Sequence, residues 1–170
     1  MCIRCRAKGL CGGIAVSAGG GSAEVMRFVA GGGYEMVGTF NGNPLAMAAA
    51  RAMLCEVATP EAYQRLEQLR LRAVAGLERE ISRAGLNAQV VSVGAKGCVV
   101  FTTGPVRNFR SFLEIEDGYS HAHWLFQHNG GVFLPPWGKI EQWLISVQHD
   151  EADIDKFVAN FGTFATAIAR

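Results

Sequence analysis

The clearest pattern of apolar and polar positions has the period of an α-helix and occurs twice. From Thr59-Pro60-Glu61 to Gly85, apolar residues recur every three or four positions, which predicts one long amphipathic helix. After Asp150 a second stripe of this kind predicts the last helix of the chain. The two stripes consist of Leu66, Leu69, Ala73, Leu77, Ile81 and Ala84, and of Ile154, Phe157, Val158, Phe161, Ala165 and Ile168.

Between these helices the pattern changes toward that of strands. Residues 89–93 and 98–103 are predicted to form a hairpin around a Gly-Ala-Lys-Gly turn. A third helix is expected over 117–127 and ends before two glycines. Residues 131–134 and 142–148 are two further strand candidates.

The first forty residues are rich in glycine. Glycine runs occur at positions 12–13, 19–21 and 31–33. Runs so close together exclude a regular helix or a long strand, so we expect loops around short elements. We predict a strand over residues 14–17 and a helix of one or two turns over 22–29, with Ser22 as its N-cap.

An alanine-rich helix is predicted over residues 45–57. Asn43 stands at its N-cap and Pro44 at its first position. From this point onward the elements suggest a compact α/β unit. We therefore predict two parts, residues 1–43 as the edge of one domain and residues 44–170 as a second domain with its linking helix.

Composition excludes several classes of function. Apolar residues make up 49% of the 170 positions and charged residues 18%, which indicates a packed protein. The net charge is +1, so neither nucleic acid nor an anionic membrane is an expected partner. No apolar run approaches the roughly 20 residues of a membrane span.

The five cysteines and four histidines do not predict a metal site. Cys2 and Cys5 have metal-ligand spacing, but no second pair follows nearby. Cys55 and Cys98 lie in apolar runs and are interpreted as reduced core residues of a cytoplasmic protein. Three histidines fall on the predicted third helix at a spacing that suits ligands poorly, and we assign them polar rim and capping roles. They are His121, His123 and His128.

The chemistry of the chain is suggested by two motifs. Lys8 is followed at once by a glycine-laced apolar stretch over residues 9–20, and Gly-Thr-Phe-Asn-Gly-Asn-Pro follows at 38–44. A lysine fixed at a strand end, beside glycines that let backbone approach a ligand, is a typical way to hold an aldehyde cofactor as an imine.

Both motifs resemble those of the class III (fold type I) pyridoxal-phosphate aminotransferases. Residues 8–20 are similar to the segment around the family's cofactor lysine, and residues 38–46 to its second signature. The segment from residue 131 to residue 149 is most similar to the glutamate-1-semialdehyde 2,1-aminomutase branch. The resemblance covers about residues 8 to 165.

The resemblance implies a fold, a cofactor and roles for four residues. It implies the small C-terminal α/β domain of a fold type I enzyme, together with the trailing edge of the large domain that binds pyridoxal 5'-phosphate. Lys8 would form the imine with the cofactor and later shuttle a proton. Gly38 and Thr39 would bind the cofactor phosphate across the interface of a homodimer. Glu141 would lie near the entrance for a small amino-acid or amino-aldehyde substrate.

Some features depart from the family pattern. Cys11 stands where glycine is usual, and the leader, residues 1–6, does not look like the strand that should deliver the lysine. The family's pyridine-binding aspartate, ring-stacking aromatic residue and phosphate loop all precede the lysine, whereas seven residues precede Lys8 here. We therefore expect no appreciable transaminase or aminomutase activity from this chain alone.

Several alternatives stay open at this point. Within the enzyme class, an ω- or β-amino-acid:keto-acid transaminase competes with the aminomutase. Outside it, the chain could be a non-catalytic dimerising fragment, or a small α/β binding module with a disordered Lys8 region. A longer reading frame upstream would restore the ordinary enzyme interpretation.

Overall fold

The computed structural model describes residues 3–6, 9–135, 138–140 and 142–169. Two of the predicted site residues, Lys8 and Glu141, lie outside them. The chain divides into two compact units, Met1–Ala62 and Tyr63–Arg170, which we describe separately. This division lies later in the chain than residue 43, where the sequence suggests a boundary between domains; that boundary stays a prediction.

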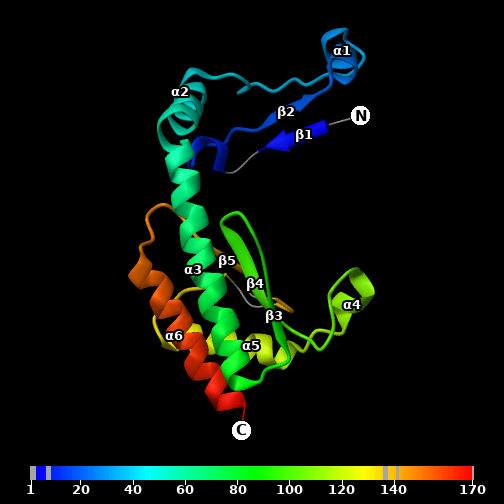
Figure 1. The fold of residues 1–170 in the computed structure, drawn as a ribbon. Helices are drawn as coiled ribbons and strands as arrows, with labels where there is room; N and C mark the ends of the chain where they lie inside the picture. Colours follow the sequence, from blue (N-terminus) through cyan, green and yellow to red (C-terminus); the bar gives the residue numbers. More distant parts are fainter. Residues whose placement is uncertain (1–2, 7–8, 136–137, 141, 170) are drawn as a thin grey trace. The chain divides into compact units, whose positions relative to one another are not determined.

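The first unit begins with two short strands. β1 (Ile3–Arg6) pairs antiparallel with β2 (Ala18–Gly21), as Figure 1 shows in dark blue. Two predictions are therefore wrong: the leader does form a strand, and the second strand begins after residues 14–17 rather than within them. The strand was predicted from the apolar residues at 14–16, whereas β2 is mostly glycine and is formed by backbone pairing.

Four helical elements follow in the described part of this unit. The 3₁₀ turn η1 (Gly9–Cys11) follows β1, and α1 (Ala23–Ala30) begins at the predicted N-cap Ser22. The predicted alanine-rich helix is confirmed as α2 (Pro44–Ala52), and a π-helical turn, η2 (Met53–Val57), continues it.

The long predicted helix is confirmed as α3 (Pro60–Ala84). The Thr59 hydroxyl accepts a hydrogen bond from the Ala62 N–H (3.2 Å), which caps its first turn. Gly85 ends it at a φ of +62°, a backbone conformation that L side chains rarely adopt.

The second unit contains an antiparallel sheet in the order β3-β4-β5. β3 (Ala88–Val93) and β4 (Lys96–Phe101) form the predicted hairpin, and β5 (Gln142–Leu144) pairs with β4. β5 is shorter than predicted because the chain turns at Ser146, whose N–H donates to His149 Nδ1 (2.9 Å). The predicted strand at 131–134 is wrong: this segment belongs to no strand, and the Val132 N–H donates to the Gln127 carbonyl instead.

Three further helices belong to the second unit. α5 (Asp117–Asn129) and α6 (Glu151–Ile168) confirm the predicted third and last helices. α4 (Phe109–Leu113) was not predicted; it is one short turn that Asn108 and Ser111 cap reciprocally. None of the described helices is long and apolar enough to cross a bilayer.

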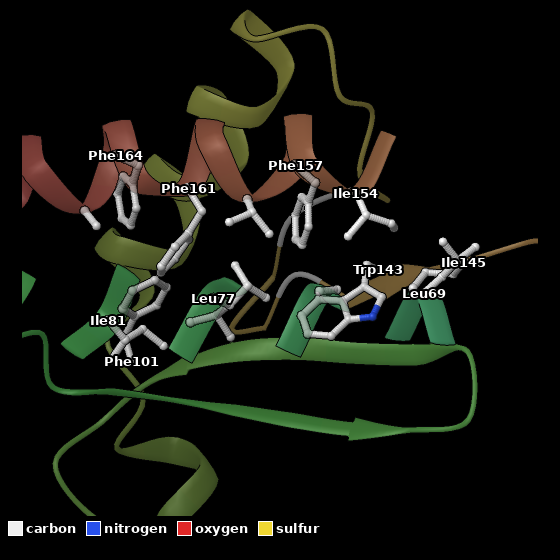
Figure 2. Packing of buried hydrophobic residues seen from close by; sticks show 14 residues of the cluster. Leu69, Leu77, Ile81, Phe101, Trp143, Ile145, Ile154, Phe157, Phe161 and Phe164 are labelled. Carbon is white, nitrogen blue, oxygen red and sulfur yellow. The ribbon is translucent and has the colours of Figure 1, made fainter. Parts of the chain in front are cut away.

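The core of the second unit lies between α3, α6 and one face of the sheet. Figure 2 shows aromatic side chains of α6 pointing toward Leu77, Phe101 and Trp143. α5 contributes Ala122 and Phe126 to this core, and it also turns buried polar residues toward it. His123 is only 1% exposed, so the predicted surface role of this histidine is wrong. Its ring lies among phenylalanines because α5 turns this face inward, and its Nε2 accepts a hydrogen bond from Gln127 Nε2 (3.1 Å).

Candidate functional site

The glycine-rich segment after Lys8 lines a hollow in the first unit. The hollow has a volume of about 970 Å³, and residues between Gly9 and Gly19 and between Met36 and Met47 line it. Its wall therefore combines the two motifs that the sequence singled out. Lys8 itself lies outside the described residues; in the sequence it directly precedes Gly9, the first residue of this wall.

Two glycines of the wall have conformations that need glycine. Gly12 and Gly13 have φ values of +59° and +121°. A Cβ at Gly13 would meet no atom within 4 Å, so conformation rather than crowding requires glycine there. With no side chains at these two positions, the backbone is open to a ligand.

Cys11 anchors the start of the segment. It is buried, and its Sγ lies 3.8 Å from the carbonyl oxygen of Ala46 on α2. Ala46 is also buried, and its small side chain lets η1 come close to α2. The cysteine that departs from the family pattern thus packs η1 against α2, only a few residues after Lys8.

Gly38 and Thr39 lie in a tight turn beside a second, shallow hollow of about 600 Å³. The Asn41 N–H donates to the Gly38 carbonyl (3.0 Å), and Asn41 Nδ2 donates to the Met36 carbonyl (3.2 Å). A Cβ at Gly38 would lie 2.8 Å from Asn41 Oδ1, so a larger residue there would displace the Asn41 side chain from its place in the turn. Within the described residues we find no hydrogen bond of the Thr39 hydroxyl, which leaves it available to a ligand.

Asn41 is a site residue that the sequence reasoning missed. It lines both hollows and fixes the turn that carries Thr39. Its position within the Gly-Thr-Phe-Asn-Gly-Asn-Pro motif could have indicated this role from the sequence. Asn43 closes the same turn, because its Nδ2 donates to the Phe40 carbonyl (3.0 Å) while its Oδ1 caps α2.

The segment before Glu141 is held firmly within the second unit. Lys139 Nζ donates to the Ile115 carbonyl (2.7 Å) and lies 3.0 Å from Asp117 Oδ1. The hydroxyl of Ser120, which is fully buried, donates to the Lys139 carbonyl (2.8 Å). Glu141 itself lies outside the described residues.

Comparison with known proteins identifies the family. Residues 2–157 match the family model of class III aminotransferases, and the chain therefore belongs to this family. It is 36% identical over 145 residues to a glutamate-1-semialdehyde 2,1-aminomutase of Desulfatibacillum aliphaticivorans, with 85% of this chain covered. It is 34% identical over 148 residues to glutamate-1-semialdehyde 2,1-aminomutase 2 of Brevibacillus brevis, with 86% covered. The chain spans about a third of the length of these relatives, 34% in both cases.

Solved structures agree on the fold. An ω-transaminase from Sphaerobacter thermophilus superposes with a TM-score of 0.79 at 26% identity, over 99% of this chain and 39% of that one. A β-phenylalanine aminotransferase from Variovorax paradoxus superposes with a TM-score of 0.79 at 28% identity. The match covers 95% of this chain and 37% of that one. The expected fold class, an α/β part of a fold type I enzyme, is confirmed.

Proposed function

We propose that this chain provides the cofactor lysine and a phosphate contact of a pyridoxal-phosphate enzyme that transfers amino groups. Within the family, we propose the chemistry of glutamate-1-semialdehyde 2,1-aminomutase, with a small amino-aldehyde or amino acid as substrate. The observation that carries the proposal is the glycine-walled hollow directly after Lys8, to which the turn of Thr39 is joined through Asn41.

The described residues around the hollow are compatible with binding of pyridoxal 5'-phosphate. The hollow of about 970 Å³ is within the size range of small-ligand sites. The open glycine backbone at Gly12 and Gly13 allows a flat ring to come close, and the Thr39 hydroxyl is a donor for a phosphate oxygen.

When it is bound, the cofactor supplies an electron sink for the bonds at the substrate's α-carbon. Lys8 would hold the cofactor at its aldehyde group, and its amine, once free, would take the proton from the substrate's α-carbon. Cys11 and Ala46 keep the backbone after Lys8 in place. Asn41 orients the turn that presents Thr39.

We further propose that the chain works in the cytoplasm as a homodimer. Three large apolar side chains near Thr39 are strongly exposed: Val37 (83%), Phe40 (81%) and Leu45 (69%). A surface of this kind is typical of a protein–protein interface. Its closeness in sequence to Thr39 supports a site to which both copies contribute.

Reductive trapping on the 170-residue chain tests the role of Lys8. Pyridoxal 5'-phosphate is added, borohydride fixes any imine, and mass spectrometry locates the label. We expect Lys8 to be labelled before the other lysines, and more by pyridoxal 5'-phosphate than by pyridoxal, which lacks the phosphate. Thr39→Val should reduce that difference while leaving the reaction with pyridoxal unchanged. Equal labelling of Lys8 and of Lys96, Lys139 and Lys156 would contradict the proposal.

Sedimentation velocity over a range of concentrations tests the dimer. We expect the chain to associate and Phe40→Asp to weaken the association. Val93→Asp is the matched control, because Val93 is 81% exposed but belongs to the second unit. A chain that is monomeric at every concentration, or that Val93→Asp disrupts as strongly, would exclude this interface.

A further inference from the structure

A third hollow lies within the second unit. Its volume is about 520 Å³, and it is bordered by the segment after α5, by β5 and by the first turns of α6. Leu134, Ile154 and Phe157 give it an apolar wall. This size and lining are typical of sites for small organic molecules.

His149 places a hydrogen-bond donor at this hollow. It lines the hollow, and its Nδ1 accepts the Ser146 N–H at 2.9 Å. A backbone N–H can only donate, so Nδ1 carries no hydrogen and the neutral ring must carry it on Nε2. The turn between Ser146 and His149 therefore fixes the tautomer and makes Nε2–H the ring's donor.

Two opposite charges stand one helical turn apart at the edge of the hollow. Asp153 and Lys156 both line it from α6 and are both exposed. The Asp153 carboxylate is oriented by the Asp150 N–H (3.0 Å), and Lys156 Nζ lies 3.5 Å from the Gly131 carbonyl. Within the described residues neither forms an ion pair, so both charges are available to a ligand.

The indole N–H of Trp143 is a buried donor at this hollow without a hydrogen-bond partner among the described residues. Trp143 as a whole is buried and lines the hollow. Figure 2 shows its ring between Phe157 and the sheet, with the nitrogen-bearing edge on the side of Ile145. Because this indole lines the hollow, its N–H signal reports on an occupant of the hollow.

We propose that this hollow binds an apolar α-amino acid as a zwitterion. The carboxylate lies at Lys156 and His149, the ammonium group at Asp153, and the side chain against Ile154 and Phe157. A simple carboxylic acid would face the Asp153 charge unpaired, and a simple amine would face Lys156. Only a ligand with both charges meets each with the opposite sign. The proposal does not rest on the cofactor chemistry, since every group that it uses lies in the second unit.

Binding of L-leucine to the 170-residue chain tests this site. The readout is the indole ¹H–¹⁵N signal of Trp143, which a Trp143→Phe variant identifies among the three tryptophan signals. We expect a saturable shift with L-leucine and at least about five-fold weaker binding of 4-methylpentanoate and of 3-methylbutylamine, which each lack one charge. Absence of a saturable shift, or equal binding of either single-charge analogue, would overturn the proposal.

Variants at the edge of the hollow test the two charges. Asp153→Asn keeps a side-chain oxygen that can accept the Asp150 N–H, and Lys156→Gln keeps a polar side chain. Each should weaken L-leucine binding about five-fold, the effect of one partly exposed ion pair. Arg110→Gln, on exposed α4, is the matched control and should bind as the wild type does. If neither edge variant weakens binding, or if Arg110→Gln weakens it equally, the assignment is wrong.

Discussion

The side chain of Val158 on α6 lies directly over Gly76 on α3. A Cβ built at Gly76 would lie 2.6 Å from Val158 Cγ2, a distance that real Cβ atoms essentially never show. The absence of a side chain at Gly76 therefore lets the two longest helices of the second unit pack closely. This explains why a glycine, which weakens helices, stands in the middle of α3.

We predict that Gly76→Ala destabilises the protein. The added methyl group forces Val158 or α6 to move, at a cost of about 1–3 kcal/mol, which exceeds the roughly 1 kcal/mol gained in helix propensity. Urea unfolding followed by circular dichroism measures the change in the free energy of unfolding. Gly118→Ala on α5 is the control, because a Cβ there meets nothing within 4 Å and should not destabilise.

A double variant makes the test of this packing specific. Val158→Ala removes the methyl groups that crowd the site, so adding Gly76→Ala to it should cost less than adding it to the wild type. Additive costs would show that the contact between these two positions is not the cause.

Because His123 is buried, we predict that the protein becomes less stable against unfolding in acid. Burial lowers the pKa of this imidazole from its ordinary value of 6.5 to about 3. The unfolded chain therefore binds a proton below about pH 6.5, whereas the folded chain does so only near pH 3. Stability should fall by about 1.4 kcal/mol for each pH unit between these values and level off below the lower one.

Urea unfolding from about pH 7 to about pH 4 measures this dependence. His123→Phe keeps a ring among the phenylalanines but cannot titrate, so its pH dependence should be flatter by that amount. Ser120→Ala, at another fully buried polar residue of α5, should lower stability without changing the slope. An unchanged slope in His123→Phe would contradict the prediction.

The sequence was sufficient for the long helices and the hairpin. Their apolar period, N-caps and terminal glycines act locally, and α3 and α6 begin at the predicted caps. The strand β2 was misplaced because its pairing with β1 is a backbone interaction that leaves no pattern in a run of glycines. α4 was missed since a helix of one turn has no period to detect.

The buried face of α5 shows a signal that was overlooked. Ser120, His123 and Gln127 recur at helical spacing and are all buried, so a polar stripe marked the inner face. Polar residues are mostly exposed in proteins, and the partners of Ser120 and Gln127 come from distant segments, such as the Phe157 carbonyl that accepts from Gln127. Of the candidate site, Gly38 and Thr39 could be proposed from the motif, whereas the packing of Cys11 and the role of Asn41 required the structure.

We predict that Asn43→Ala destabilises the first unit by about 1 kcal/mol. The Asn43 Oδ1 accepts the Ala46 N–H (2.9 Å) at the start of α2, and alanine leaves that donor without its cap. Thermal unfolding followed by circular dichroism measures the effect. Asn43→Asp keeps the capping oxygen and should be close to the wild type, whereas equal losses in both variants would show that the cap is not responsible.

Lys139→Met should destabilise the second unit by about 1–3 kcal/mol, since it leaves the Ile115 carbonyl without its donor. The methionine keeps most of the apolar stem, so the loss reports on the ammonium group rather than on packing. Asp117→Asn removes the charge that lies 3.0 Å from Lys139 Nζ but leaves the Ile115 carbonyl satisfied, and it should cost less. Lys96→Met, at an exposed lysine of β4, controls for the loss of one positive charge. If Asp117→Asn costs as much as Lys139→Met in urea unfolding, the ion pair rather than the carbonyl contact holds residues 138–140 in place.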